Sequence, residues 1–206
     1  MNTAQQNAVV ELLRVAPVAD ELADRFTAAG HSLYLVGGSV RDALLGRLGA
    51  DLDFTTDARP PEVLRILSGW ADAVWDTGIA YGTVGARRGG TPMEITTFRA
   101  DAYDRVSRNP LVRFGDSVED DLLRRDFTVN AMAVELTGAE RRFVDPHGGL
   151  AALSAGTLDT PATPEESFAD DPLRMLRAAR FVAQLNFTPV PRVVAAIREM
   201  ADQLAR

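Results

Sequence analysis

Apolar and polar residues follow two recurring patterns along the chain, short apolar runs and longer amphipathic stretches. Short runs bounded by glycine or proline are typical of strands, whereas apolar residues at intervals of three and four are typical of helices. We predict strands near 33–36, 51–56, 74–75, 82–87, 93–98, 131–136 and 142–144. We predict helices on both sides of Pro17 within 1–30, at 39–45, 60–67 and 192–206, and from Pro172 onward within 165–187.

The stretch 33–56 is predicted to be a strand, a tight turn, a helix and a returning strand. Gly37 and Gly38 follow the apolar run and allow a tight turn or a close approach of the backbone to a ligand. Ser39 is predicted to be the N-cap of the helix. Because Arg41 lies in the first turn, this helix start is suited to binding phosphate groups.

The returning strand carries two aspartates, Asp51 and Asp53, on either side of Leu52. Alternation sends both carboxylates to one face and the leucine to the other. Two carboxylates so placed are suited to sharing divalent metal ions. Asp-x-Asp is also typical of a solvated strand face, so this spacing alone leaves both interpretations open.

Taken together, 33–56 resembles the first signature of the class II tRNA nucleotidyltransferases, the CCA-adding enzymes and bacterial poly(A) polymerases of the polymerase-β-like superfamily. That signature is Val-Gly-Gly-x-Val-Arg-Asp-x-Leu-Leu-Gly followed by Asp-x-Asp. The resemblance implies that Asp51 and Asp53 are the catalytic ligands of two Mg²⁺ ions. It also implies that the phosphates are held by Gly37, Gly38 and Arg41.

Glu94 begins the segment Glu-Ile-Thr-Thr-Phe-Arg, which also resembles the family pattern and implies a third metal ligand. The alternative is an exposed strand glutamate. Residues 99–118 are polar and resemble the flexible loop of CCA-adding enzymes, with Arg99 and Asp101 at its start. The segment departs from the family at 107–110, where Ser-Arg-Asn-Pro stands in place of the usual Asp-Gly-Arg-His-Pro.

Residues 119–132 resemble the second family signature, Arg-Arg-Asp-Phe-Thr-x-Asn-Ala-Met. The resemblance implies that Arg125 contacts the nucleotide and that Asp126 and Asn130 belong to the ribose region. Without it, a surface ion-pair cluster is the simpler interpretation. Residues 145–150 match the Asp-Pro-x-Gly-Gly turn of the family, in which His147 occupies a variable position without a catalytic role.

Within 165–187, Pro172 suits the first position of a helix and Asp171 its N-cap. The segment resembles the nucleobase-selecting motif Glu-Asp-x-x-Arg, with aspartate in place of the first glutamate. This implies that Asp171 and Arg174 select the base. Arg177 and Arg180, which follow at intervals of three, are assigned to the phosphates. The alternative is a capped helix with a solvated arginine face.

Composition narrows the possible functions. The 206 residues contain no cysteine and only two histidines, which excludes disulfides, thiolate nucleophiles and histidine-rich metal sites. The lack of cysteine fits a cytoplasmic protein, and no apolar run approaches the roughly 20 residues of a membrane span. All 22 basic residues are arginine, and the net charge is −7. A chain this acidic is expected to bind tRNA weakly by itself.

We therefore predict an α+β fold, with a nucleotidyltransferase head on a small mixed or antiparallel sheet at 1–150 and the start of a helical neck at 151–206. Family members continue into helical domains that hold tRNA, so we expect a fragment or a minimal form. The implied function is template-independent transfer of CMP and AMP from CTP and ATP to the 3′ end of tRNA. Alternatives are a poly(A) polymerase, a CC-only or A-only enzyme, and a non-catalytic nucleotide-binding fragment. Oligomeric state is not predicted.

Overall fold

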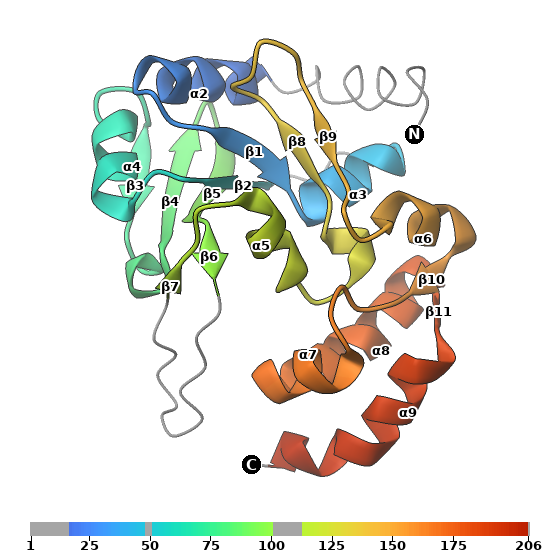
Figure 1. Cartoon of the computed structure of the whole chain (residues 1–206). Helices are drawn as coiled ribbons and strands as arrows, with labels where there is room; N and C mark the ends of the chain where they lie inside the picture. Colours follow the sequence, from blue (N-terminus) through green and yellow to red (C-terminus); the bar gives the residue numbers. More distant parts are fainter. Residues whose placement is uncertain (1–16, 48–50, 101–112, 206) are drawn as a thin grey trace. The chain divides into compact units, whose positions relative to one another are not determined.

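The computed structural model describes residues 17–47, 51–100 and 113–205 (Figure 1). They divide into two compact units. The first, here called the sheet unit, lies within Met1–Asp121 and Ala133–Val144. The second, the helical unit, comprises Leu122–Met132 and Asp145–Arg206. This division assigns 122–132 to the C-terminal part, whereas the predicted boundary near residue 150 remains a prediction. The helix predicted before Pro17 lies outside the described residues.

The sheet unit is built on seven strands in the order β3-β4-β5-β2-β1-β8-β9. The strands are β1 (Leu33–Val36), β2 (Leu52–Thr56), β3 (Ala73–Trp75), β4 (Thr83–Arg88), β5 (Thr91–Thr97), β8 (Ala133–Glu135) and β9 (Phe143–Val144). All neighbouring pairs are antiparallel except β2 and β5, which are parallel. The prediction of an α+β fold on a mixed, mostly antiparallel sheet is therefore confirmed.

One face of this sheet is apolar. Leu35, Phe54, Ile95 and Val84 are cross-strand neighbours in one row and are almost completely buried. The helices α2 (Pro17–Ala28) and α4 (Pro60–Leu67) pack on the sheet through the apolar sides that their sequences predict (Figure 1). Burial of these side chains is the main contribution to the stability of this unit.

The opposite face is polar, because the same alternation places threonines and carboxylates on it. Thr83, Thr96 and Thr55 form a row across β4, β5 and β2. The hydroxyl groups of Thr83 and Thr96 are 2.9 Å apart, and the Thr55 hydroxyl donates to the Thr96 carbonyl at 3.0 Å. Hydrogen bonds between neighbouring residues thus satisfy the hydroxyl groups on this face.

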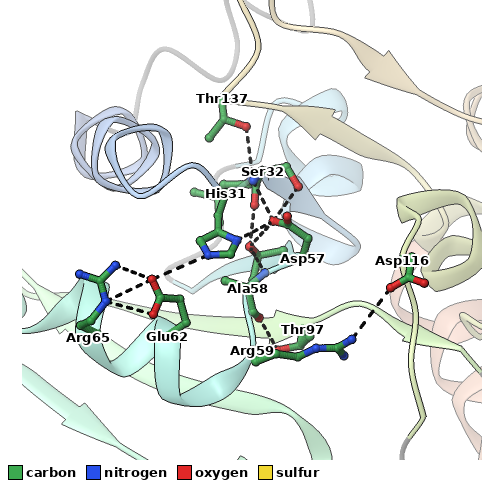
Figure 2. A network of polar contacts seen from close by, with 12 residues as sticks. His31, Ser32, Asp57, Ala58, Arg59, Glu62, Arg65, Thr97, Asp116 and Thr137 are labelled. Atoms are coloured by element: carbon green, nitrogen blue, oxygen red, sulfur yellow. Dashed lines mark hydrogen bonds and ion pairs between the residues drawn. The ribbon is translucent and has the colours of Figure 1, made fainter.

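A polar network fastens the beginning of β1 to the end of β2 (Figure 2). The Asp57 carboxylate accepts hydrogen bonds from the Ser32 backbone at 2.8 Å and the Ser32 hydroxyl at 3.0 Å. His31 lies between two carboxylates, with Nδ1 3.4 Å from Asp57 and Nε2 3.7 Å from Glu62. A hydrogen bond from Arg65 lowers the pKa of Glu62, so that this carboxylate stays charged next to His31.

The polar segment predicted as a loop at 99–118 is partly regular. Its ends pair as a short antiparallel ladder, β6 (Arg99–Ala100) with β7 (Arg113–Phe114), and α5 (Val118–Leu123) begins within it. The prediction of a loop was therefore wrong at these ends, because pairing of the two ends satisfies their backbone groups. Residues 101–112 lie outside the described ranges.

The helical unit contains η2 (Thr128–Asn130), α6 (Gly149–Ala155), α7 (Pro164–Asp170), α8 (Leu173–Leu185), α9 (Pro191–Met200) and η3 (Ala201–Ala205). A short parallel pair joins β10 (Thr157–Leu158) to β11 (Thr188–Pro189). Its core comprises Phe168, Met175, Val193, Ala196 and Met200. No helix within the described ranges has both the length and the apolar character needed to cross a membrane.

Candidate functional site

The predicted phosphate-binding turn is present at the end of β1. Gly37 has φ 67° and is buried, a conformation that residues with a side chain rarely adopt. The helix α3 (Gly38–Leu44) begins directly after it, and the Gly37 carbonyl accepts a hydrogen bond from the Arg41 backbone at 3.1 Å. The backbone amides at this helix start are of the kind that bind anions.

Ser39 has a different position from the one predicted. The N-cap is Gly37, without a side-chain cap, and Ser39 lies one residue inside α3. Its hydroxyl accepts a hydrogen bond from the Asp53 backbone at 2.9 Å and donates to the Asp51 carbonyl at 3.3 Å. The side chain therefore fastens the glycine turn to the strand that carries the two aspartates. From sequence, a serine at this place could not be distinguished from a cap.

Arg41 lies against the same turn. Its side chain is largely buried, and its guanidinium group makes a bidentate pair with Asp42 at 2.8 and 2.9 Å. Nη2 lies 3.4 Å from the place that a Cβ on Gly38 would occupy. This positive charge is therefore fixed next to the turn and already shared with one carboxylate, so a phosphate bound here would compete with Asp42.

The three carboxylates predicted to bind metal lie on or next to the polar face of the sheet. Asp51 is exposed and immediately precedes β2, Asp53 is half-buried within it, and Glu94 is exposed on β5. Asp53 and Glu94 are direct neighbours in the parallel register.

Within the described ranges, no three Asp, Glu or His side chains gather into a group that would hold a metal ion by themselves. Mg²⁺ is commonly held by one or two carboxylates together with substrate phosphates. The donor set at β2 fits that kind of site, because its oxygen ligands lie beside the glycine turn that is suited to phosphate.

Tyr34 closes this polar face on the β1 side. It is the register neighbour of Thr55 and of Glu135, and its ring packs 5.8 Å from that of Phe98. Burial, with the nearby Glu135 charge, raises the pKa of Tyr34. Its phenol therefore remains protonated at neutral pH and carries no charge toward the carboxylates.

In the helical unit, Asp126 is the centre of a hydrogen-bonded group. Its side chain is only 7% exposed. One carboxylate oxygen accepts from the Phe127 backbone at 2.8 Å and from the Asn130 amide at 2.9 Å. The other accepts from Arg177 Nε at 2.7 Å. Three donors, one of them the charged Arg177, thus provide this buried carboxylate with hydrogen-bond partners.

Arg177 and a second predicted arginine, Arg180, lie close to an aromatic side chain on α8. The guanidinium groups of Arg177 and Arg180 lie 5.8 and 5.0 Å from the centre of the Phe181 ring, within the range of cation–π contacts. Phe181 itself packs edge-on against Phe127 at 5.7 Å. Arg125 is half-buried in the turn after α5. The exposed side of α8 is therefore positively charged and held in place by an aromatic pair.

Asp171 and Arg174 are held by bonds to the protein itself. The predicted helix start was wrong by one residue, because Pro172 is the N-cap of α8 and Asp171 is the C-cap of α7. The Asp171 carboxylate nevertheless accepts a hydrogen bond from the Leu173 backbone, the first residue of α8, at 3.0 Å. Arg174 is largely buried and donates to the Ser167 hydroxyl at 2.9 Å and to the Arg124 carbonyl at 2.7 Å. These bonds use part of its five donors and leave others for a ligand.

The structure thus brings the predicted residues together in two groups. Those of the sheet unit are Gly37, Gly38, Arg41, Asp51, Asp53 and Glu94. Those of the helical unit are Arg125, Asp126, Asn130, Asp171, Arg174, Arg177 and Arg180. Sequence reasoning missed Ser39 as a tether and Ser167 as the partner of Arg174, because neither belongs to a charged motif.

Comparison with known proteins supports one family. Residues 33–159 match the model of the poly A polymerase head domain. The chain is 42% identical over 179 residues to the CCA-adding enzyme of Levilactobacillus brevis, covering 86% of this chain and 43% of that protein. It is 41% identical over 177 residues to the CCA-adding enzyme of Geobacillus kaustophilus, covering 85% of this chain and 42% of that protein.

Solved structures agree with this match. The CCA-adding enzyme of Bacillus stearothermophilus in complex with CTP superposes with a TM-score of 0.79 at 38% identity, over 91% of this chain and 44% of that chain. A tRNA nucleotidyltransferase complexed with a primer tRNA and an incoming ATP analogue gives 0.71 at 29% identity, over 88% and 50%. The chain spans less than half the length of the curated relatives it matches. With a family model that covers more than half of its residues, the chain belongs to the poly A polymerase head domain family.

Proposed function

We propose that this chain is the catalytic head of a cytoplasmic tRNA nucleotidyltransferase, which adds CMP and AMP from CTP and ATP to the 3′ end of tRNA without a template. The observation that carries the proposal is the Ser39 tether. It holds the glycine turn, suited to phosphate, against the strand of Asp51 and Asp53. The similarity to CCA-adding enzymes supports CTP, ATP and tRNA as the substrates in this proposal.

In the proposed reaction the 3′-oxygen of the RNA attacks the α-phosphorus of the nucleotide. A new P–O bond forms, the bond to the β-phosphate oxygen breaks, pyrophosphate leaves, and the hydroxyl proton passes to solvent. Two Mg²⁺ ions bound at Asp51 and Asp53, with Glu94 as a further ligand, would acidify the hydroxyl and neutralise the leaving group. Gly37, Gly38 and Arg41 hold the triphosphate in place.

The helical unit supplies the remaining contacts in this proposal. Asp171 and Arg174 select the base, and Arg177 and Arg180 neutralise phosphate charge. Arg125 contacts the nucleotide, and Asp126 with Asn130 orients the ribose. The hydrogen bonds that already hold Asp126 and Arg174 support these roles, because groups fixed before binding lose less entropy when a ligand arrives.

The test is incubation of the chain with Mg²⁺, a tRNA that lacks its 3′ CCA end, and each nucleoside triphosphate in turn. We expect CMP and then AMP to be incorporated, and nothing from UTP or GTP. Incorporation of AMP alone in long runs would indicate a poly(A) polymerase instead. Nucleotide binding without incorporation, at any tRNA concentration, would contradict the proposal.

The same assay addresses affinity for tRNA. Because the net charge is −7, residues 1–206 are expected to need high tRNA concentrations. Tight binding that weakens steeply with salt would contradict this expectation.

A further inference from the structure

An exposed tryptophan borders the polar face of the sheet. Trp75 ends the edge strand β3, and its side chain is 38% exposed. Its indole lies against the backbone of β4 at Gly85, where an added Cβ would be only 1.9 Å from Nε1. Because glycine has no side chain, it leaves room for the ring at this position. The indole of Trp75 therefore occupies the place that a side chain at position 85 would fill.

The strand register places this indole in the row of the candidate metal site. Trp75 is paired with Gly85, Gly85 with Glu94, and Glu94 with Asp53. Paired residues of neighbouring strands point to the same face. With strands about 4.8 Å apart, the indole over Gly85 lies about 10 Å from the Asp53 backbone. That separation is comparable to the span of one nucleotide.

A positive charge stands on the same face. Arg87 follows Gly85 by two residues, so it points to the same side, and its neighbours in the row are Ala73 and Pro92. The side chain is exposed and makes no hydrogen bond or ion pair with any residue that the structure describes. An aromatic ring and an unpaired guanidinium group side by side are the usual elements of a surface that binds single-stranded nucleic acid.

We propose that Trp75 and Arg87 bind the single-stranded 3′ end of the RNA primer. The terminal base stacks on the indole, the phosphate before it lies at Arg87, and the 3′-hydroxyl points toward Asp53. This proposal rests on the proposed function. Asp53 and Glu94 repel the RNA backbone, and Arg87 offsets that repulsion.

The primer, rather than the incoming nucleotide, is the occupant that suits this surface. The terminal base of the primer changes as each nucleotide is added, so its site must accept different bases. Stacking on an aromatic ring is tolerant of sequence, because every base has a π-face. Choice among incoming nucleotides instead requires hydrogen bonds to the edges of the base.

The test uses the fluorescence of Trp75. Trp70 and Trp75 are the two tryptophans, and Trp70 is buried, with its indole donating to Glu21 at 2.9 Å. In a Trp70→Phe variant all indole emission comes from Trp75. We expect a short single-stranded RNA that ends in cytidine to quench this emission saturably, and CTP alone to leave it unchanged. Equal quenching by CTP, or RNA binding without quenching, would overturn the proposal.

Paired substitutions separate binding from folding. Trp75→Leu should weaken RNA binding by about 5- to 100-fold, the loss expected when one base can no longer stack. Val74→Ala is the control, because Val74 is also exposed on β3 but points to the other face. Gly85→Ala should displace the indole and lower RNA affinity in the same way, since no Cβ fits beneath it.

Arg87 is tested against its neighbour. Arg87→Gln should reduce the slope of log affinity against log salt by about one. Arg88→Gln should leave that slope unchanged, because Arg88 points to the other face and is bonded to the Trp70 carbonyl and close to Asp72. Equal salt slopes in Arg87→Gln and Arg88→Gln would overturn the proposal. It would also be overturned if Trp75→Leu lowered the melting temperature but left RNA affinity unchanged.

Turnover distinguishes the two proposals. If the parent chain incorporates CMP but Trp75→Leu needs no more primer for half-maximal rate, the primer surface is wrong while the proposed function stands. If the parent incorporates nothing, the proposed function fails, and the fluorescence titration still decides whether Trp75 binds RNA.

Discussion

The two units hold their candidate residues in different ways. In the sheet unit, Asp51 is exposed and Asp53 is half-buried, and the backbone of both is held by hydrogen bonds with the Ser39 hydroxyl. In the helical unit, Asp126 and Arg174 are buried, and their own charged groups make the hydrogen bonds.

Because of this difference, substitutions in the sheet unit should mainly affect activity, and substitutions in the helical unit should mainly affect stability. Where the backbone positions a residue, its side chain can be removed with little effect on the fold, so the loss should fall on activity. Where the charged group is itself part of the packing, removal leaves donors or acceptors unsatisfied, and the fold should lose stability. The predictions below test this contrast.

Asp53→Ala should give the largest effect, a loss of activity. Loss of a metal-binding carboxylate should lower CMP incorporation by about 10³-fold or more. In Asp51→Ala the melting temperature should stay the same or rise slightly, because the bond from Ser39 to the Asp51 carbonyl remains and repulsion between like charges decreases. Labelled CMP incorporation and thermal unfolding are the two measurements. Asp51→Ala should lose CMP incorporation in the same way as Asp53→Ala.

Asp24→Ala is the matched control, since it removes an exposed carboxylate from the helix α2 and not from the strand β2 that carries Asp53. It should change neither quantity. Glu94→Ala should reduce activity less than Asp53→Ala does. Normal activity in Asp51→Ala or Asp53→Ala would rule out the proposed metal site, and normal activity in Glu94→Ala would leave Glu94 as a surface residue.

Asp126→Asn should act mainly on stability. One oxygen of the Asp126 carboxylate accepts two hydrogen bonds from buried groups, and the other accepts one from Arg177. In the asparagine variant an NH₂ group replaces one of these oxygens, so the donors that faced it lose their acceptor. Each unsatisfied group costs about 1–3 kcal/mol. Urea denaturation of the purified chain should show a lower midpoint. Arg177→Gln is the comparison variant and should lose less, because that side chain is 44% exposed. An unchanged midpoint in Asp126→Asn would mean that this network does not support the fold.

Asp171→Asn should change selectivity by about tenfold and leave stability unchanged, because asparagine also caps helices well. The carboxylate only accepts hydrogen bonds, so it favours the exocyclic amines of cytosine and adenine over the carbonyls of uracil and guanine. The substituted amide also donates and should tolerate UTP and GTP. Incorporation of all four nucleotides by both proteins is the measurement. The same preference in both would leave Asp171 as a helix cap only.

The sequence allowed the elements with strong local signals to be predicted. The strand Leu33–Val36 and the helix Pro60–Leu67 have the predicted bounds, because an apolar run before Gly-Gly and a Pro-Pro start before an apolar stripe depend on neighbours in sequence. The helix Pro164–Asp170 was not separated from α8, although its capping box of Thr163 and Glu166 was readable.

Contacts between distant segments could not be predicted. The bond of Arg177 to Asp126 joins positions 51 residues apart, and that of Arg174 to the Arg124 carbonyl joins positions 50 apart. The row that links Trp75 to Asp53 requires the register of four strands. Motifs therefore named the charged residues, while the groups that hold them depended on tertiary pairing.

The smallest predicted effect concerns pH and belongs to the helical unit alone. Burial lowers the pKa of His147, although the nearby Asp145 opposes this shift. Its Nε2 is buried without a hydrogen-bond partner among the described residues, so the folded chain favours the neutral ring. The unfolded chain binds a proton near pH 6.5, before the folded chain does. Stability is therefore complete above that pH and falls as pH decreases toward the folded pKa.

His147→Phe keeps a ring of similar shape that cannot titrate, so its unfolding free energy should depend less on pH between about pH 5 and pH 8. Urea denaturation across this range, with the parent chain alongside, is the measurement. His31→Gln is the control, because it removes the other histidine, which lies in the sheet unit between Asp57 and Glu62. If the parent and His147→Phe lose stability in parallel on acidification, the neutral, partly buried ring is not the cause.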